Sequence, residues 1–245
     1  KYNHIELCKV LTGKIASVSP YIGQYSEGFG GRSSVKDFET MLQLIYLNFT
    51  GIRQDDNAFS AMINMYKATM SNSEKDPRKA FSDTVSIMAS NHHKRTVLVN
   101  LQSISKIDQL KAIQVFKERF NTPADFTFVF TGNINPDDEQ VKNAVLTYLG
   151  SIRIKAGNDK AIDHKIRTPR GLVDNKFTKE MKIKKASNYI MYTGHLPYNL
   201  ENQICVEAIA SILDLRYTES IREKEGGTYG VGVRGRLSKE PVNQA

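Results

Sequence analysis

The spacing of apolar residues predicts a helix shortly after the first glycine-rich segment of the chain. Between residues 35 and 49, apolar residues recur at intervals of three and four, which places on one helical face Val35, Phe38, Met41, Leu42, Ile45 and Phe49. Ser33 or Ser34 is placed to cap the start of this helix, and Gly51 is placed to end it. The segment is therefore expected to turn this face toward a core.

Two more helices are predicted between residues 55 and 90. The first has one apolar face made of Phe59, Met62, Ile63, Met65 and Tyr66. Because methionine commonly fills irregular gaps in cores, we expect this face to be core rather than a cofactor site. The second helix begins at Asp76 as its cap, with Pro77 in the first turn, where a missing backbone N–H costs nothing.

Alternating and β-branched residues predict strands elsewhere in the first half. Near the amino terminus, short strands interrupted by Gly13 and Pro20 are predicted from Val10, Leu11, Ile15 and Val18. Residues 26–34 (SEGFGGRSS) are typical of a turn-rich loop, whose glycines let the backbone turn or lie close to a neighbour. We therefore expect strands, then a loop, before the first helix.

The clearest predicted strand covers residues 126–131. Three phenylalanines there alternate with Thr127, Val129 and Thr131. Gly132 and Asn133 then turn the chain toward a helix near Pro136, and helical spacing also precedes the strand in residues 103–120. The predicted order is helix, strand, turn, helix.

A polar, charged segment at residues 157–171 is the best candidate linker. A charged strand, the strand SNYIMYTGHLP (187–197), a long helix and a strand after Gly226 and Gly227 follow it. This order is typical of an α+β layer with helices on one face of a mainly antiparallel sheet. We predict two α+β subdomains, residues 1–160 and 161–245.

Composition excludes a disordered or fibrous chain, because 40% of the residues are hydrophobic and 24% are charged. The net charge of +8 leaves acidic or polyanionic partners open, but the densest basic stretch, Lys179–Lys185, alternates with apolar residues like a solvated strand. Cys8 and Cys205 sit among apolar neighbours, where unpaired cysteines are usually buried. No run approaches the about 20 apolar residues of a membrane helix, and no signal peptide is recognised.

The motifs that usually carry metal or nucleotide chemistry are missing from the sequence. The histidines are His4, His92, His93, His164 and His195, and none lies in H-E-x-x-H or H-x-x-E-H spacing. The segments GFGG and EGGTYG lack the spacing of phosphate-binding loops. No metal site is predicted within this chain.

One candidate for chemistry remains, at the end of the long helix. Arg222 lies in its last turn, and Tyr229 begins the following strand after the Gly226-Gly227 turn. An arginine there is also favoured by the helix dipole, and tyrosine is a good strand residue, so a purely structural interpretation stays open.

Four segments carry a resemblance to a known family. Residues 213–235 (LDLRYTESIREKEGGTYGVGVRG), preceded by LPYNLENQICVEAIASI, resemble the closing motif of the pitrilysin/insulinase family of zinc metallopeptidases. Residues 27–59 and FTFVFTGNIN (126–135) resemble other parts of that family, so the resemblance spans most of the chain. It implies a fold like that of mitochondrial processing peptidase, with two related subdomains per half and two halves that close over a peptide.

The resemblance also implies roles for the candidate residues. This chain lacks the inverted zinc motif, so it resembles the zinc-free carboxy-terminal half, with zinc bound by an amino-terminal half on the same or another chain. Tyr229 would donate a hydrogen bond to the oxygen that becomes negative when zinc-activated water attacks the peptide carbonyl, and Arg222 would hold a substrate carbonyl or that oxygen. Gly226, Gly227 and Thr228 would lie where a peptide adds as a strand.

The resemblance leads to further expectations. The second subdomain looks truncated at its carboxy-terminal end, and the piece alone is expected to be inactive. A bacterial periplasm or envelope is the expected location. Two other functions stay open: a non-peptidase subunit that binds peptides or acts as a scaffold, and, less favoured, a basic module that binds nucleic acid.

Overall fold

The computed structural model describes residues 2–120, 122–154, 160, 162–181, 184–228 and 230–245. The fold is α+β, as predicted: helices combine with a small antiparallel sheet. The chain forms two compact units, the first made of Lys1–Lys79 and Val97–Ile162 and the second of Ala80–Thr96 and Asp163–Ala245. The predicted subdomain boundary between residues 160 and 161 stays a prediction.

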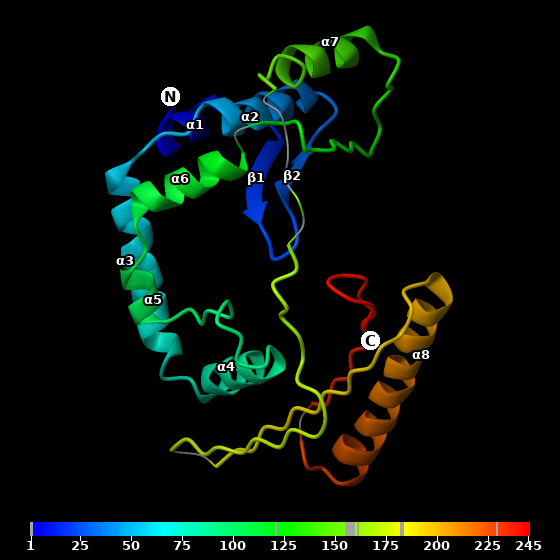
Figure 1. Ribbon diagram of the computed structural model, residues 1–245. Coiled ribbons are helices and arrows are strands. Elements are labelled where there is room, and N and C mark those ends of the chain that lie inside the picture. Colours follow the sequence, from blue (N-terminus) through cyan, green and yellow to red (C-terminus); the bar gives the residue numbers. More distant parts are fainter. Residues whose placement is uncertain (1, 121, 155–159, 161, 182–183, 229) are drawn as a thin grey trace. The chain divides into compact units, whose positions relative to one another are not determined.

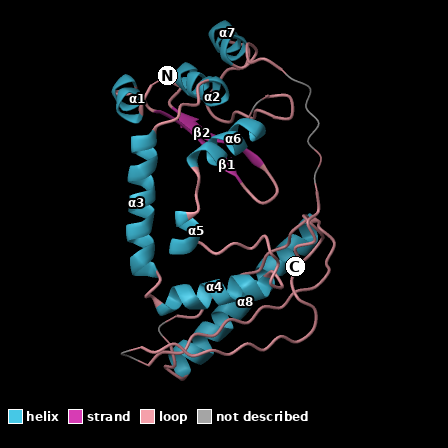
Figure 2. Ribbon diagram, turned by 60° about the vertical axis from the view of Figure 1, so that its left-hand side comes forward, coloured by secondary structure: helices cyan, strands magenta, loops and turns pink. Residues whose placement is uncertain are grey.

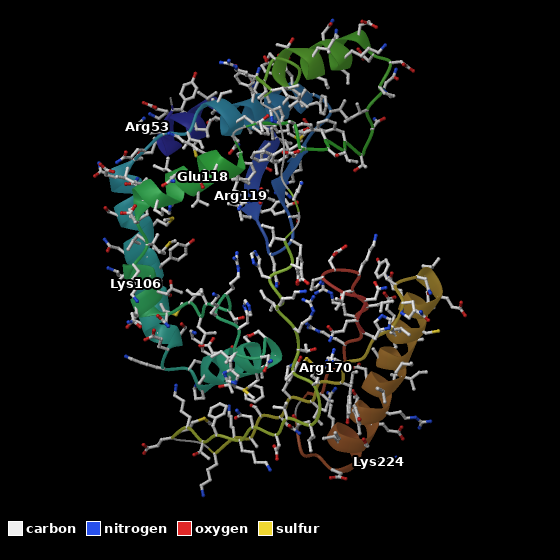
Figure 3. The ribbon with its side chains drawn as sticks, in the orientation of Figure 1. Arg53, Lys106, Glu118, Arg119, Arg170 and Lys224 are labelled. Atoms are coloured by element: carbon white, nitrogen blue, oxygen red, sulfur yellow. The ribbon has the colours of Figure 1, made fainter. Side chains whose placement is uncertain are left out.

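The first unit is built around one helix and one hairpin. Strands β1 (Ala16–Ile22) and β2 (Glu27–Ser33) pair antiparallel, and α2 (Phe38–Thr50) packs against both strands and against α7 (Glu139–Tyr148) (Figure 1). The other helices of this unit are α1 (His4–Val10), α3 (Asp56–Ser73), α5 (Leu101–Ser105) and α6 (Gln109–Arg119). In α6, Arg119, labelled in Figure 3, lies 3.5 Å from a carboxylate oxygen of Glu27 on β2.

The core of this unit is the predicted face of α2. Phe38, Met41, Leu42 and Ile45 are buried and pack against β1, α7 and the phenylalanines at 128 and 130. Val35 lies before the helix and is exposed, because the helix begins three residues later than its apolar pattern. Gly51 ends the helix as predicted, but neither Ser33 nor Ser34 is its cap, since Asp37 occupies that position.

Helices α3 and α4 lie where the sequence predicted them, but the expected burial of the apolar face of α3 was wrong. Helix α3 begins after its cap Asp55, and α4 (Pro77–Ala89) has Pro77 in its first position, with the N–H of Arg78 donating to Asp76. The apolar face of α3 is mostly exposed, including Met65 and Tyr66, because α3 packs against the short helix α5, which covers only a narrow stripe.

The amino-terminal strand predictions were partly wrong. Val10 ends α1 instead of forming a strand, and residues 26–34, expected as a loop, contain β2. Pairing with β1 explains this, because Gly28 lies opposite Tyr21 and a Cβ atom on it would come within 2.9 Å of the tyrosine oxygen. The glycines weaken strand propensity but admit the close approach that the hairpin uses.

Residues 126–131 do not form a hydrogen-bonded strand, although the predicted alternation is visible in their side chains. Phe128 and Phe130 pack against the α2 core, while Val129 is 77% exposed. Alternating residue types predict which side chains are buried. A strand also needs backbone hydrogen bonds to a second strand, and the part of the chain that the structure describes provides no such strand for residues 126–131. Figure 2 shows strands, in magenta, in the β1–β2 hairpin.

The second unit contains α8 (Leu200–Tyr217) and η1 (Thr218–Lys224), together with the part of α4 that falls in this unit. The strands predicted at 179–185, 187–197 and after Gly227 form no regular ladder in the described residues. The side chains of the first two of these segments are mostly exposed on both faces, as at Ile190 and Met191. After the glycine turn, residues 231–237 instead alternate between half-buried or buried and exposed positions. Antiparallel pairing is limited to two hydrogen bonds exchanged by Gly194 and Ala245 and a bridge between Ser238 and Gln244.

Candidate functional site

Arg222 lies on a rare piece of secondary structure. Helix α8 starts at its cap Asn199, whose side chain accepts a hydrogen bond from the N–H of Asn202, and it continues into the π-helical segment η1, which carries Arg222. π-Helical turns are uncommon and are frequently found at functional sites. The Arg222 side chain is exposed on this segment.

Glu219, one of the two glutamates on the same segment, is engaged by other cations. Glu219 lies 3.0 Å from the ammonium of Lys224, labelled in Figure 3 at the end of η1, and 3.6 Å from the guanidinium of Arg216. Within the described residues, no hydrogen bond or ion pair reaches the side chain of Arg222. Its planar set of N–H donors is therefore presented to solvent and fits a carbonyl, carboxylate or oxyanion from outside.

The Gly-Gly pair has a structural role at the end of η1. Gly226 adopts a left-handed φ of +60°, and the N–H of Gly227 donates to the carbonyl of Ile221 at 3.1 Å, which closes the helix end. A Cβ atom on Gly226 would have nothing within 4 Å, and one on Gly227 would lie 3.8 Å from the Ile221 oxygen. The turn is thus open on its outer side, and both glycines are exposed.

The structure describes Thr228 and Gly230, on either side of position 229, after the turn. The Thr228 hydroxyl accepts a hydrogen bond from the N–H of Gly230 at 3.3 Å and donates to the Gly230 carbonyl at 3.1 Å. Tyr229, the other predicted catalytic residue, lies outside the described residues. The structure therefore brings Arg222, Gly226, Gly227 and Thr228 to one helix end, and the roles predicted for these residues and for Tyr229 remain predictions.

The chain then runs back along α8. The N–H of Val233 donates to Oδ1 of Asp214 at 2.8 Å, and Gly235 lies against Val206 and Ala210. The sequence analysis singled out neither Asp214 nor Gly235. A signal was present: Asp214 is a lone acid in the apolar run from Ile209 to Leu215, next to a glycine-rich strand.

The described residues do not fit a zinc site. No cluster of three or more His, Cys, Asp or Glu side chains that could hold a metal ion occurs among them. His93, in the only adjacent histidine pair of the sequence, accepts a hydrogen bond from the N–H of Arg95 through Nδ1 at 3.2 Å. Cys8 and Cys205 are exposed, which corrects the expectation that both are buried.

A pocket of about 230 Å³ in the first unit offers no alternative catalytic site. It lies between the end of β2 with the start of α2 and residues 129–134, and Arg32 is its one charged lining residue. No acid, base or nucleophile pair is present in this lining to activate a reactant. Among the described residues, no helix has the length and apolar character needed to cross a membrane.

Comparison with known proteins connects this geometry to a family. Residues 109–241, more than half of the chain, match the family described as "Peptidase M16 inactive domain". The matched range contains α6, α7, α8, η1 and the glycine turn. The candidate site therefore lies inside the matched region.

Two known proteins are similar in sequence. The chain is 26% identical over 212 residues to "Probable zinc protease PqqL" of Escherichia coli (strain K12), which covers 83% of the chain and 21% of that protein. It is 29% identical over 130 residues to "Zinc protease PQQL-like" of Arabidopsis thaliana, covering 51% of the chain and 13% of that protein. The chain thus spans about a fifth or less of these relatives.

A solved structure shares the fold. The periplasmic protease PqqL from Escherichia coli matches with a TM-score of 0.71 over 97% of this chain and 26% of that chain, at 21% sequence identity. At this identity the likeness shows a common fold.

Proposed function

The chain belongs to the family of peptidase M16 inactive domains, and from this premise we propose that it forms the zinc-free half of an insulinase-like metallopeptidase. In this proposal the chain closes over a peptide and supplies binding groups to a reaction centre on the other half. The observation that carries the proposal is the exposed Arg222 on a π-helical segment, beside an open glycine turn, within the matched region.

The chemistry of Arg222 supports a binding role. A guanidinium stays protonated at all working pH values and presents donors in a fixed plane, so it cannot act as a base but can hold an oxygen. Negative charge develops on the carbonyl oxygen during peptide hydrolysis, and preorganised donors stabilise it. We assign Arg222 to the substrate carbonyl or to this oxygen.

Tyr229 is assigned by resemblance to the same task. A phenol donates a hydrogen bond while remaining neutral at pH 7, so it stabilises an oxyanion without taking a proton. Gly226, Gly227 and Thr228 are assigned to the edge along which the peptide lies, because bare backbone admits another strand closely. The open outer side of the Gly226 turn is compatible with such an approach.

The remaining parts of the enzyme are assigned elsewhere. Zinc would be bound by the amino-terminal half, on the same or another chain, since the described residues of this chain do not fit a metal site. The substrates would be unfolded peptides small enough to enter a closed chamber. A periplasmic or envelope location is proposed from the relative described as the periplasmic protease PqqL.

The test uses the assembled enzyme, in which this chain is combined with the zinc-bearing half, and a quenched-fluorescent peptide library. Tyr229→Phe and Arg222→Ala are each expected to lower turnover by about 100- to 1,000-fold, the usual cost of losing one oxyanion donor. Arg216→Ala is the matched control, because Arg216 is a cation on the same helical run that lies 3.6 Å from Glu219.

The kinetic pattern decides between roles. A fall in kcat with KM largely kept supports action in the transition state. Wild-type rates for both variants would reject the catalytic assignment and leave Arg222 as a helix-end cation. Peptide binding without cleavage by the assembled wild type would favour a non-peptidase subunit that binds peptides or acts as a scaffold.

A further inference from the structure

We propose that Asp214 is a positioning residue, which tethers the segment after the glycine turn to α8 and thereby fixes the turn for the peptide. This inference rests on the proposed function of Gly226, Gly227 and Thr228. It concerns how the chain holds these residues in place, which no motif in the sequence indicates.

The first observation is that a single hydrogen bond joins the described residues of this segment to the rest of the unit. Residues 228–237 follow the turn, and of the hydrogen bonds made by the described residues among them, one leads out of the segment. It runs from the N–H of Val233 to Oδ1 of Asp214, at 2.8 Å. The Thr228 bonds stay within the segment, because both end on Gly230.

The second observation is the placement of Asp214 on α8. Val206, Ala210 and Asp214 are spaced by four and therefore lie along one stripe of the helix. Val233 lies at Asp214, and Gly235 lies at Val206 and Ala210, so the segment runs opposite to the helix along this stripe. Asp214 is the polar end of the stripe, on the side nearest to η1.

The third observation is the close contact further along the segment. A Cβ atom on Gly235 would lie 2.5 Å from the Val206 carbonyl oxygen and 3.0 Å from Cβ of Ala210. Gly235 therefore lets the backbone lie directly on α8, and Leu237, two residues further along, is buried. Close contact at Gly235 holds the far end of the segment on α8, and the Asp214 bond is the hydrogen bond that holds the described residues nearer to the turn.

The chemistry of the bond suits this role. Hydrogen bonds between a backbone N–H and a carboxylate are stronger than neutral ones and have a preferred direction. Without it, Val233 would lose the hydrogen bond that joins its backbone to α8, and the segment would be held there by side-chain packing alone. The positions of Thr228 and of the open glycine backbone would then vary, and a peptide would meet the turn less often in the correct geometry.

The experiment compares Asp214→Ala and Asp214→Asn in the assembled enzyme. Asp214→Ala is expected to lower kcat/KM by about tenfold or more, mainly through KM, as expected for loss of a hydrogen bond to a charged group. Asp214→Asn retains an oxygen that accepts the same bond, so its kcat/KM is expected within about threefold of wild type. Glu207→Ala, which removes an exposed acid from the same helix, is the control and is expected to cleave normally.

Hydrogen exchange of the Val233 amide gives a readout that does not depend on catalysis. The amide is expected to lose protection in Asp214→Ala and to keep it in Asp214→Asn. Wild-type kcat/KM in Asp214→Ala, with or without lost protection, would overturn the inference, and so would equal impairment of both variants. The isosteric Asp214→Asn keeps the test decisive if Asp214→Ala fails to fold.

The failure of this inference differs from the failure of the proposed function. Impaired Arg222→Ala together with normal Asp214→Ala rejects the positioning role alone. Normal Arg222→Ala and Tyr229→Phe reject the proposed function, whatever the exchange of the Val233 amide shows.

Discussion

At the scale of single residues, the two glycines at the end of η1 have different requirements. Gly226 has a φ of +60°, which L-residues adopt at a cost, whereas the backbone of Gly227 is not left-handed and a Cβ atom there meets only an ordinary contact. Gly226→Ala is therefore expected to destabilise the chain by about 1 kcal/mol. Gly227→Ala is expected to change the free energy of unfolding by less than about 0.5 kcal/mol.

Urea unfolding followed by circular dichroism measures both variants against wild type. Equal losses would show that the helix end does not depend on the left-handed residue. If Gly227→Ala keeps stability but loses peptide cleavage in the assembled enzyme, bare backbone at this position serves the substrate rather than the fold.

At the scale of elements, Asp37 joins the start of β1 to the start of α2. Its Oδ2 accepts hydrogen bonds from the N–H of Ile15 at 2.9 Å and from the hydroxyl of Ser34 at 2.7 Å. These bonds, with smaller contributions from Lys36 and Lys14, lower the pKa of the Asp37 carboxyl. The side chain of Asp37 caps no helical N–H, so its role is to connect the two elements.

The lowered pKa predicts a pH dependence of stability. A carboxyl whose pKa is lower in the folded state stabilises the fold above its unfolded-state pKa of about 3.9, and this stabilisation is lost as the pH falls through the folded-state value. Asp37→Asn is therefore expected to be less stable than wild type at pH 7, with the difference shrinking toward pH 3. Urea unfolding at pH 7, 5 and 3 measures this, with the exposed Asp125→Asn as control. A difference that stays constant with pH would contradict the prediction.

The elements also show which parts of the fold a sequence can predict. Helix α2 was predicted well because the spacing of its apolar residues, the glycine at its end and the burial of its apolar face all indicate the same helix. Strand β2 was missed because its glycines indicate a turn, while the strand depends on its pairing with Tyr21 of β1. In residues 126–131 the local pattern correctly predicted which side chains are buried. It could not predict whether a second strand lies beside them, because strand pairing depends on residues far away in the sequence.

The candidate site shows the same division. The Gly226 turn and the helix end at Arg222 are local, so the sequence predicted them. The bond from Val233 to Asp214 joins residues 19 positions apart, and it was not predicted. The π-helical form of η1 was not predicted either. Resemblance supplied the assignment of Tyr229, because chemistry shared between two halves leaves no complete motif in one of them.

At the scale of the whole molecule, the proposed function predicts that binding zinc and supplying oxyanion donors are divided between two halves. The chain alone is expected to show no peptide cleavage, because the described residues hold no cluster of three or more His, Cys, Asp or Glu side chains that could bind zinc. Adding the zinc-bearing half is expected to produce cleavage that saturates at one chain per half. Titration with a quenched-fluorescent peptide measures the rate, and sedimentation measures the complex.

The Arg222→Ala chain separates assembly from chemistry. The Arg222 side chain is exposed and makes no hydrogen bond or ion pair within the described residues, so its loss is expected to leave the folded chain and its complex intact while turnover falls. Full cleavage by the zinc-bearing half alone would contradict the division of labour. A complex that forms but does not cleave with the wild-type chain would indicate that this half binds peptides without serving hydrolysis. Cleavage that appears with wild type and is lost with Arg222→Ala at unchanged stoichiometry would place the guanidinium in the reaction rather than in the interface.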